Sequence, residues 1–166
     1  MNDIPKMISV DDTNLMPFGR NLAGDVSKDD YGDDRRKCFI RIPDPRQANQ
    51  LLDMGCRVKQ TKPHADEDPD DYVPVYYVQA VLKYRDKQGH EMKYPPKVYL
   101  VNLDGVPVPL DEENVKLLDN IRIKNVNVIL NPWENNNGGI SLFIRTMYVE
   151  QDFDDDPYAA RYGRRE

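Results

Sequence analysis

The sequence predicts a mainly β fold: a five-stranded Greek-key barrel with a short helix between its third and fourth strands. A short helical pattern at 112–119 falls between the third and fourth of five β-rich runs. This order of elements, three strands, one helix and then two strands, is that of the OB-fold, a barrel that often binds single-stranded nucleic acid. The five runs lie at residues 38–42, 72–84, 97–103, 121–130 and 140–149.

A further helix is predicted at 45–54, directly after the first strand. Asp44 suits its N-cap, Pro45 suits its first position and Gly55 suits its C-terminal stop. The residues that follow, 57–61, can form an edge strand whose charged side chains guard the edge or contact phosphate.

The second and third strands each have one face that is more polar than the other. Gln79 and Lys83 mark that face on the second strand, so we expect Tyr77, which shares it, to be exposed. On the third strand Lys97 and Tyr99 share a face. Because the inside of a closed barrel must be apolar, Tyr99 is expected to point outward.

Asp111 is the expected cap of the helix at 112–119, and Val115, Leu117 and Leu118 form its apolar face. A helix this short is not stable alone in water, so we expect it to pack on the barrel between strands three and four. The fourth strand lacks a clean alternation, which predicts a bend or bulge midway.

The length of 166 residues suits one domain with tails. Residues 1–37 show no periodicity and are predicted to form a flexible arm. Residues 38–149 are the OB-fold domain, and residues 150–166 are predicted to be a disordered tail, first acidic and then Arg-rich. No apolar run is long enough to span a bilayer and no secretory signal is visible, which favours a cytoplasmic protein, in the host cytoplasm if it is viral.

The net charge of −6 argues at first sight against a nucleic-acid partner. The predicted domain, 38–149, holds fourteen Lys and Arg against fifteen Asp and Glu, and five of those acids crowd into 66–71. Without that segment ten acids remain and the net charge is +4. The candidate barrel is therefore mildly basic and has acidic appendages.

No catalytic constellation is present: the sequence has no Gly-rich phosphate loop, no nucleophile-elbow motif and no pair of histidines at helical spacing. Cys38 and Cys56 match no zinc or redox spacing and are predicted to be reduced and structural. The acidic segment 66–71 lacks the spacing of a calcium loop and is expected to be solvated. The sequence predicts no enzymatic activity, no cofactor and no metal.

Aromatic residues are numerous for so small a core: ten tyrosines, four phenylalanines and one tryptophan. Bases stack on exposed rings for about 1–3 kcal/mol each, and phosphate contacts must add to this. Binding led by stacking selects single strands, DNA or RNA, because duplex DNA hides its base faces. The candidate nucleic-acid-binding residues are Trp133, Tyr77, Tyr99, Phe143, Tyr148, Arg145, Lys59, Lys83, Lys97, Arg122 and Lys124.

Two interpretations stay open for some of these features. Trp133, in the predicted loop 131–139, either folds back to close the barrel end or stacks on a base, since the loop between strands four and five is a gripping loop of OB-folds. The basic cluster at 35–37 is either a solvated group or a phosphate contact at the barrel rim.

Several of these runs resemble the OB-fold single-stranded DNA-binding proteins of tailed bacteriophages. The resemblance covers 38–149 and rests on Asn-Val-Ile-Leu-Asn-Pro-Trp-Glu (127–134) and Ile-Ser-Leu-Phe-Ile-Arg-Thr-Met-Tyr-Val (140–149). Phe-Ile-Arg-Ile-Pro (39–43), Tyr-Tyr-Val-Gln-Ala-Val-Leu-Lys-Tyr (76–84) and Lys-Val-Tyr-Leu-Val (97–101) are also similar to that group.

This resemblance implies a role in phage DNA replication and recombination: coating exposed strands, protecting them from nucleases and removing hairpins. It implies that Trp133, Arg145 and Tyr148 lie in or beside the binding groove. Bacterial single-stranded DNA-binding proteins generally end in an acidic tip closed by apolar residues, which recruits partner proteins, so replication or recombination proteins are possible partners of this tail. Here three arginines follow the acidic run 152–156, which puts recruitment by this tail in doubt.

The alternative function is a β-barrel module for protein interaction or virion assembly that binds no nucleic acid. Such a module would bind a defined protein partner and no oligonucleotide. The sequence leaves the oligomeric state open.

Overall fold

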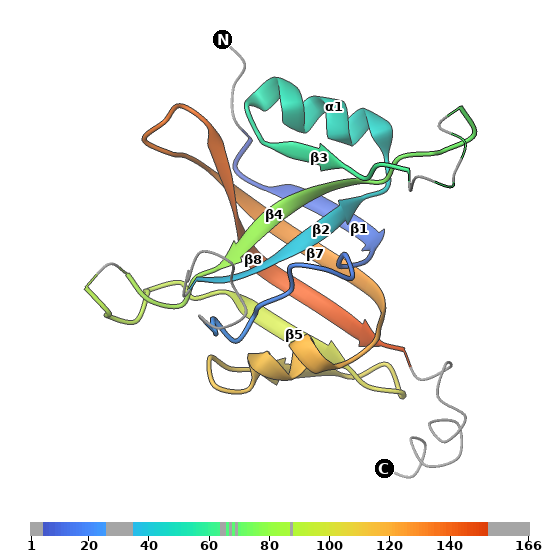
Figure 1. The fold of residues 1–166 in the computed structure, drawn as a ribbon. Helices are drawn as coiled ribbons and strands as arrows, with labels where there is room; N and C mark the ends of the chain where they lie inside the picture. Colours follow the sequence, from blue (N-terminus) through green and yellow to red (C-terminus); the bar gives the residue numbers. More distant parts are fainter. Residues whose placement is uncertain are drawn as a thin grey trace.

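The computed structural model describes residues 5–25, 35–63, 66, 68, 70–86 and 88–152 of the chain (Figure 1). Its strands form one sheet in the order β1-β7-β8-β4-β2, with β3 beside β4 and with β5 between β8 and β6. The elements are β1 (Ile8–Thr13), β2 (Arg36–Ile42), α1 (Pro45–Met54), β3 (Val58–Gln60), β4 (Tyr76–Leu82), β5 (Lys97–Val101), β6 (Pro107–Leu110), η2 (Val115–Asn120), β7 (Ile123–Glu134) and β8 (Ile140–Gln151).

The predicted fold class, mainly β with a short helix before the last two strands, is confirmed. The strand count differs, because the described residues form eight strands in an open sheet where a closed barrel of five had been predicted. β3 coincides with the predicted edge strand at 57–61, whereas β1 was not predicted. The predicted tail lies outside the described residues from residue 153 onward.

β1 lies in the segment that the sequence described as an arm without periodicity. Its buried side chains include Val10, which pairs with Val128 of β7. The register then shifts where Asp12 takes a left-handed backbone with φ 52°. Because of this irregularity and the two adjacent aspartates, the segment lacks the alternation of polar and apolar residues that would have predicted a strand.

The chain after β1 continues along β2, so the arm spans the gap between the two outer strands of the sheet order. The amide of Met16 donates to the carbonyl of Phe39 at 2.8 Å, and the amide of Asn21 donates to the carbonyl of Lys37 at 2.8 Å. Leu22 lies beyond these contacts and is fully buried. The described part of the arm is therefore integral to the core.

α1 forms as the sequence predicts, because its start and stop signals are local. The Asp44 carboxylate accepts from the amide of Arg46 at 2.9 Å, and Pro45 opens the helix. Gly55 ends it in a left-handed conformation with φ 105°. Leu51 is buried against the sheet while its neighbour Leu52 is exposed.

The second predicted helix forms as the 3₁₀ helix η2. Asp111 accepts from the amides of Glu113 and Asn114 in the turn before η2, but it is not the cap that was predicted. η2 begins three residues later than expected, and its N-cap position is Asn114, whose side chain makes no capping hydrogen bond. Residues three apart share a face in a 3₁₀ helix, so Val115 and Leu118 are buried, whereas Leu117, which the sequence had assigned to the apolar face, is half exposed.

The β7–β8 hairpin is longer than predicted. The loop expected at 131–139 is shortened, because β7 continues through Pro132 and Trp133 to Glu134. A proline is tolerated there since β1 pairs with β7 only as far as Leu130, which leaves one edge of β7 unpaired beyond that point. The predicted irregularity is present, with register shifts next to Ile123 and between 129 and 130.

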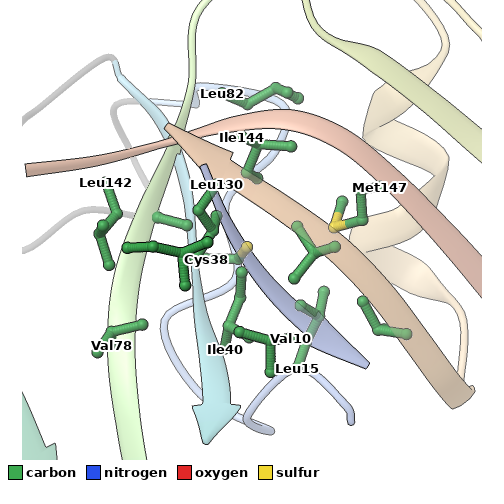
Figure 2. Packing of buried hydrophobic residues seen from close by; sticks show 14 of the residues in the cluster. Val10, Leu15, Cys38, Ile40, Val78, Leu82, Leu130, Leu142, Ile144 and Met147 are labelled. Carbon is green, nitrogen blue, oxygen red and sulfur yellow. The ribbon is translucent and has the colours of Figure 1, made fainter. Parts of the chain in front are cut away.

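The core lies between the inner faces of these strands (Figure 2). Cys38 and Ile40 of β2 meet Val78 of β4 and Leu130 of β7, and all four side chains are nearly or fully buried. Both cysteines are unpaired thiols and buried, as predicted. In Figure 1, α1, β3 and the tip of the hairpin lie at one end of the molecule, and the gold-coloured η2 lies at the other.

Candidate nucleic-acid interface

A groove of about 610 Å³ extends from the end of α1 and the hairpin tip along β4 and β8 to Arg35, next to the first residue of β2. We name it the Arg57 groove. Its volume is within the range of small-molecule sites, which gives room for a nucleotide unit. It is lined by Arg35, Gly55, Cys56, Arg57, Lys59, Gln79, Val81, Asn135, Asn137, Gly139, Ile140, Ser141, Leu142 and Phe143.

The walls of the groove are held together where α1 ends. The left-handed Gly55 turns the chain so that the amide of Cys56 donates back to the carbonyl of Leu51 at 2.9 Å. The carbonyl of Gly55 then accepts from the amide of Ile140 at 3.1 Å. This bond fixes the start of β8 to the residues that precede β3, so two segments far apart in sequence form one concave surface.

The hairpin tip is ordered by Asn135. Its side-chain oxygen accepts from the backbone amides of Asn137 and Gly139 at 3.0 Å, and its backbone amide donates to the carbonyl of Gly139 at 2.8 Å. Gly138 supplies the positive φ of 81° that the turn requires. The polar loop is therefore a shaped rim rather than a loose connection.

The charge of the groove is positive. Arg35, Arg57 and Lys59 line it, and no carboxylate is among the described residues that do so. Arg57 is exposed and has no hydrogen-bond or ion-pair partner among the described residues. A concave surface with these cations and without a carboxylate among its described lining residues attracts anions such as phosphate.

Strand register places two predicted aromatic residues on the same face of the sheet, and one of them, Phe143, lines the groove. Phe143 lines it and pairs with Val81 of β4 on one side and with Asn131 of β7 on the other. Trp133 pairs with Ser141, two residues before Phe143 on β8, so both rings stand on the same face of the sheet. Trp133 is 68% exposed, which excludes the interpretation that it closes the end of the barrel.

Tyr77 and Lys59 lie on the same face and are cross-strand partners between β4 and β3. Tyr77 is half-buried, because its ring makes edge contacts with Phe18 and Phe39 at 5.2 Å between centroids. The ammonium of Lys59 lies 5.3 Å from the centroid of Phe39. Lys83 follows on the same face of the chain, just after β4 ends, and is partly exposed.

A second pair of predicted aromatics lies further along β8 and does not line the groove. Tyr99 and Tyr148 are cross-strand partners whose rings stack on each other, 4.7 Å between centroids and 12° from parallel. Lys97 is exposed two residues before Tyr99, on the same face, as the sequence predicted.

The remaining predicted cations are not gathered at the groove. Arg145 is exposed at the β8 irregularity, and its guanidinium donates to the sulfur of Met7 at 3.0 Å. Arg122 and Lys124 lie at the start of β7, at the other end of that strand from Trp133. The carbonyl of Arg122 accepts from the amide of Asp152, which places an acidic residue beside it.

Four residues of this surface were not among the sequence candidates. Arg57 had a signal, since it directly follows the predicted helix stop in a charged edge segment. Phe39 faces outward on a strand whose alternation was readable. Arg35 belonged to the basic cluster whose role the sequence left open, and Phe18 had no signal, because the arm around it shows no periodicity.

The described residues hold no group of three or more His, Cys, Asp or Glu that could bind a metal ion. Burial raises the pKa of Cys38 to about 12 and that of Cys56 to about 11. Thiols with such raised pKa values are poor nucleophiles at neutral pH. The side chains that the groove does present are an aromatic ring, which can stack, and cations, which can form ion pairs.

Comparison with known proteins agrees with this geometry. A family model described as "Putative phage ssDNA-binding domain" matches residues 2–163. The chain belongs to this family. The match includes most of both tails, beyond the 38–149 over which the sequence resemblance was recognised. The family is one of phage single-stranded DNA-binding domains, as the sequence indicated.

Among solved structures, the chain is similar to gp2.5, a single-stranded DNA-binding protein encoded by bacteriophage T7. The two are 17% identical, 97% of each chain is covered and the TM-score is 0.39. A search of curated proteins found no match. None of the described helices is both long and apolar enough to cross a bilayer.

Proposed function

We propose that the chain binds single-stranded DNA in the Arg57 groove, with bases stacked on Phe143 and Trp133 and phosphates held by Arg57 and Lys59. The observation that carries this proposal is the combination, in one concave surface, of three cations, no carboxylate among the described lining residues and an aromatic ring. Family membership supports the choice of single-stranded DNA as the ligand.

Such a groove accepts a strand without reading its sequence. Every base has a π face, so stacking on Phe143 and Trp133 does not depend on base identity. Duplex DNA keeps its bases stacked inside and meets a chain of net charge −6, so only phosphate contacts remain for it. The protein would thus coat and protect exposed single strands, a role in binding rather than catalysis.

The phage family supports the setting that we propose. Strand coating during phage DNA replication and recombination, in the cytoplasm of the infected host, would bring the protein into contact with replication or recombination proteins. The alternative of an assembly module without nucleic-acid binding has no support from the family.

The proposal is tested with the fluorescence of Trp133, the only tryptophan of the chain. Titration with a dT oligomer should quench it, and Phe143→Ala should weaken binding by about 1–3 kcal/mol, five- to 150-fold in Kd. A double variant with Arg57→Ala and Lys59→Ala should bind the oligomer more weakly than Phe143→Ala does at low salt, because both phosphate contacts are lost.

Lys116→Ala is the matched control, because Lys116 is an exposed cation on η2, at the other end of the molecule. Its affinity for the oligomer should equal that of the wild type. If the dT oligomer changes neither the Trp133 fluorescence of the wild type nor its own mobility in a gel at low salt, the proposed function is wrong. If Phe143→Ala and the control behave alike, the site is misplaced.

A further inference from the structure

We propose that the N-terminal arm supplies a second base-stacking position, centred on Phe18 and continuous with the Arg57 groove. The inference rests on the proposed function and extends its site to the part of the arm at 5–25, in which the sequence offered no candidate residue. It is argued from three observations: the ring geometry at Phe18, the anchoring of the arm and the cations that surround it.

Phe18 is 42% exposed and belongs to a cluster of three rings. Its centroid lies 5.7 Å from that of Phe39, with the planes tilted by 54°, and 5.2 Å from that of Tyr77, with the planes at 77°. None of the ring pairs in this cluster is parallel, unlike the stacked Tyr99 and Tyr148. Edge-on packing leaves ring faces that are not covered by another ring of the cluster, and a base can stack on such a face.

The arm holds Phe18 in a fixed position. Backbone hydrogen bonds tie the chain to β2 on both sides, through Met16 and Asn21, each at 2.8 Å. Gly19 brings the backbone directly over Phe39: its φ is 72°, and a Cβ at this position would lie 2.4 Å from the Phe39 ring. An ordered ring loses little conformational entropy when it meets a ligand, which favours binding.

Cations flank the ring cluster and connect it to the groove. Lys59 lies over Phe39 and also lines the groove. Arg41 is exposed and is the cross-strand partner of Tyr77. Along β4 the path from Tyr77 to Val81, the partner of Phe143, is four residues, about 13 Å at strand spacing. A strand a few nucleotides long can therefore reach from the groove to Phe18.

Two substitutions separate stacking from packing. Phe18→Leu keeps an apolar side chain against Phe39 and Tyr77 but removes the aromatic face, whereas Phe18→Tyr keeps the ring. With a twelve-nucleotide dT oligomer, Phe18→Leu should raise Kd about fivefold or more, and Phe18→Tyr should bind as the wild type does. The salt dependence of binding should not change in either variant, since no phosphate contact is lost.

The controls decide between the possible causes. Leu117→Ala, which trims a half-exposed apolar residue on η2, should leave Kd unchanged. Wild-type affinity in Phe18→Leu would overturn the inference, and so would equal weakening in the Leu and Tyr variants, which would indicate a packing effect. Because the wild type and Phe143→Ala are titrated in parallel, a failure at Phe18 alone leaves the proposed function intact. Absence of wild-type binding would remove both.

Discussion

At the scale of single residues, the buried cysteines link protonation to stability. The pKa of Cys38 rises to about 12 and that of Cys56 to about 11, from an ordinary value of 9.0, because burial penalises the thiolate. The folded chain therefore keeps both protons at pH 10, where the unfolded chain releases them. Stability from these thiols is fully present below pH 9 and is lost as pH rises above it.

We expect the free energy of unfolding to fall between pH 8 and pH 10, by about 1 kcal/mol for each thiol. Urea unfolding at the two pH values measures this fall. Cys38→Ala should be less stable than the wild type at pH 8 because it leaves a cavity, yet its fall between the two pH values should be smaller. An unchanged fall would mean that Cys38 does not titrate as its burial implies.

The orientation of individual side chains could be predicted from the sequence where polar and apolar residues alternate along a strand. Tyr77 and Tyr99 face outward as the polar residues on their strands had indicated. Trp133 was expected in a loop and is instead on a strand, because Pro132 is tolerated at an unpaired edge. No local rule could assign Phe18 to the surface, since its position depends on hydrogen bonds to β2, a strand further along the chain.

At the scale of elements, α1 was predictable to the residue, whereas β1 was missed. The signals that begin and end α1 lie within the helix and its flanks, at Asp44, Pro45 and Gly55. β1 depends on pairing with β7, more than a hundred residues away, and its alternation is broken at Asp12. The groove is equally non-local, because Arg57 and Phe143 are brought together by the bond between Gly55 and Ile140 and by the pairing of both β3 and β8 with β4.

The arm is therefore expected to contribute stability that a flexible segment would not. Leu22 is fully buried, so Leu22→Ala should lower the free energy of unfolding by about 2–5 kcal/mol. Leu52→Ala is the matched control, since Leu52 is half exposed on α1 and its loss should cost under about 0.5 kcal/mol. Chemical denaturation of both variants measures the difference. Equal values would place the arm outside the cooperative core.

At the scale of the whole molecule, the charges are unevenly distributed. The chain carries a net charge of −6, yet the Arg57 groove has three cations and no carboxylate among its described lining residues. Overall negative charge repels duplex DNA and other polyanions at long range, and the local cations act at contact distance within a Debye length of about 8–10 Å. This arrangement favours a ligand that gains most of its affinity from stacking.

The salt dependence of binding tests that balance. Single-stranded DNA loses affinity with a slope in log K against log salt of about −0.7 for each phosphate neutralised, so the two phosphate contacts proposed here, at Arg57 and Lys59, predict a slope of about −1.4. Arg57→Ala should reduce it to about −0.7, and Lys116→Ala should leave it unchanged. A duplex of equal length should bind more weakly at every salt concentration, because it offers no base faces to Phe143 and Trp133.

A wild-type slope near zero would show that no phosphate lies on these cations. A slope several times steeper would show that cations outside the groove, such as Arg122 and Lys124, share the strand, and would restore the wider interface that the sequence had suggested.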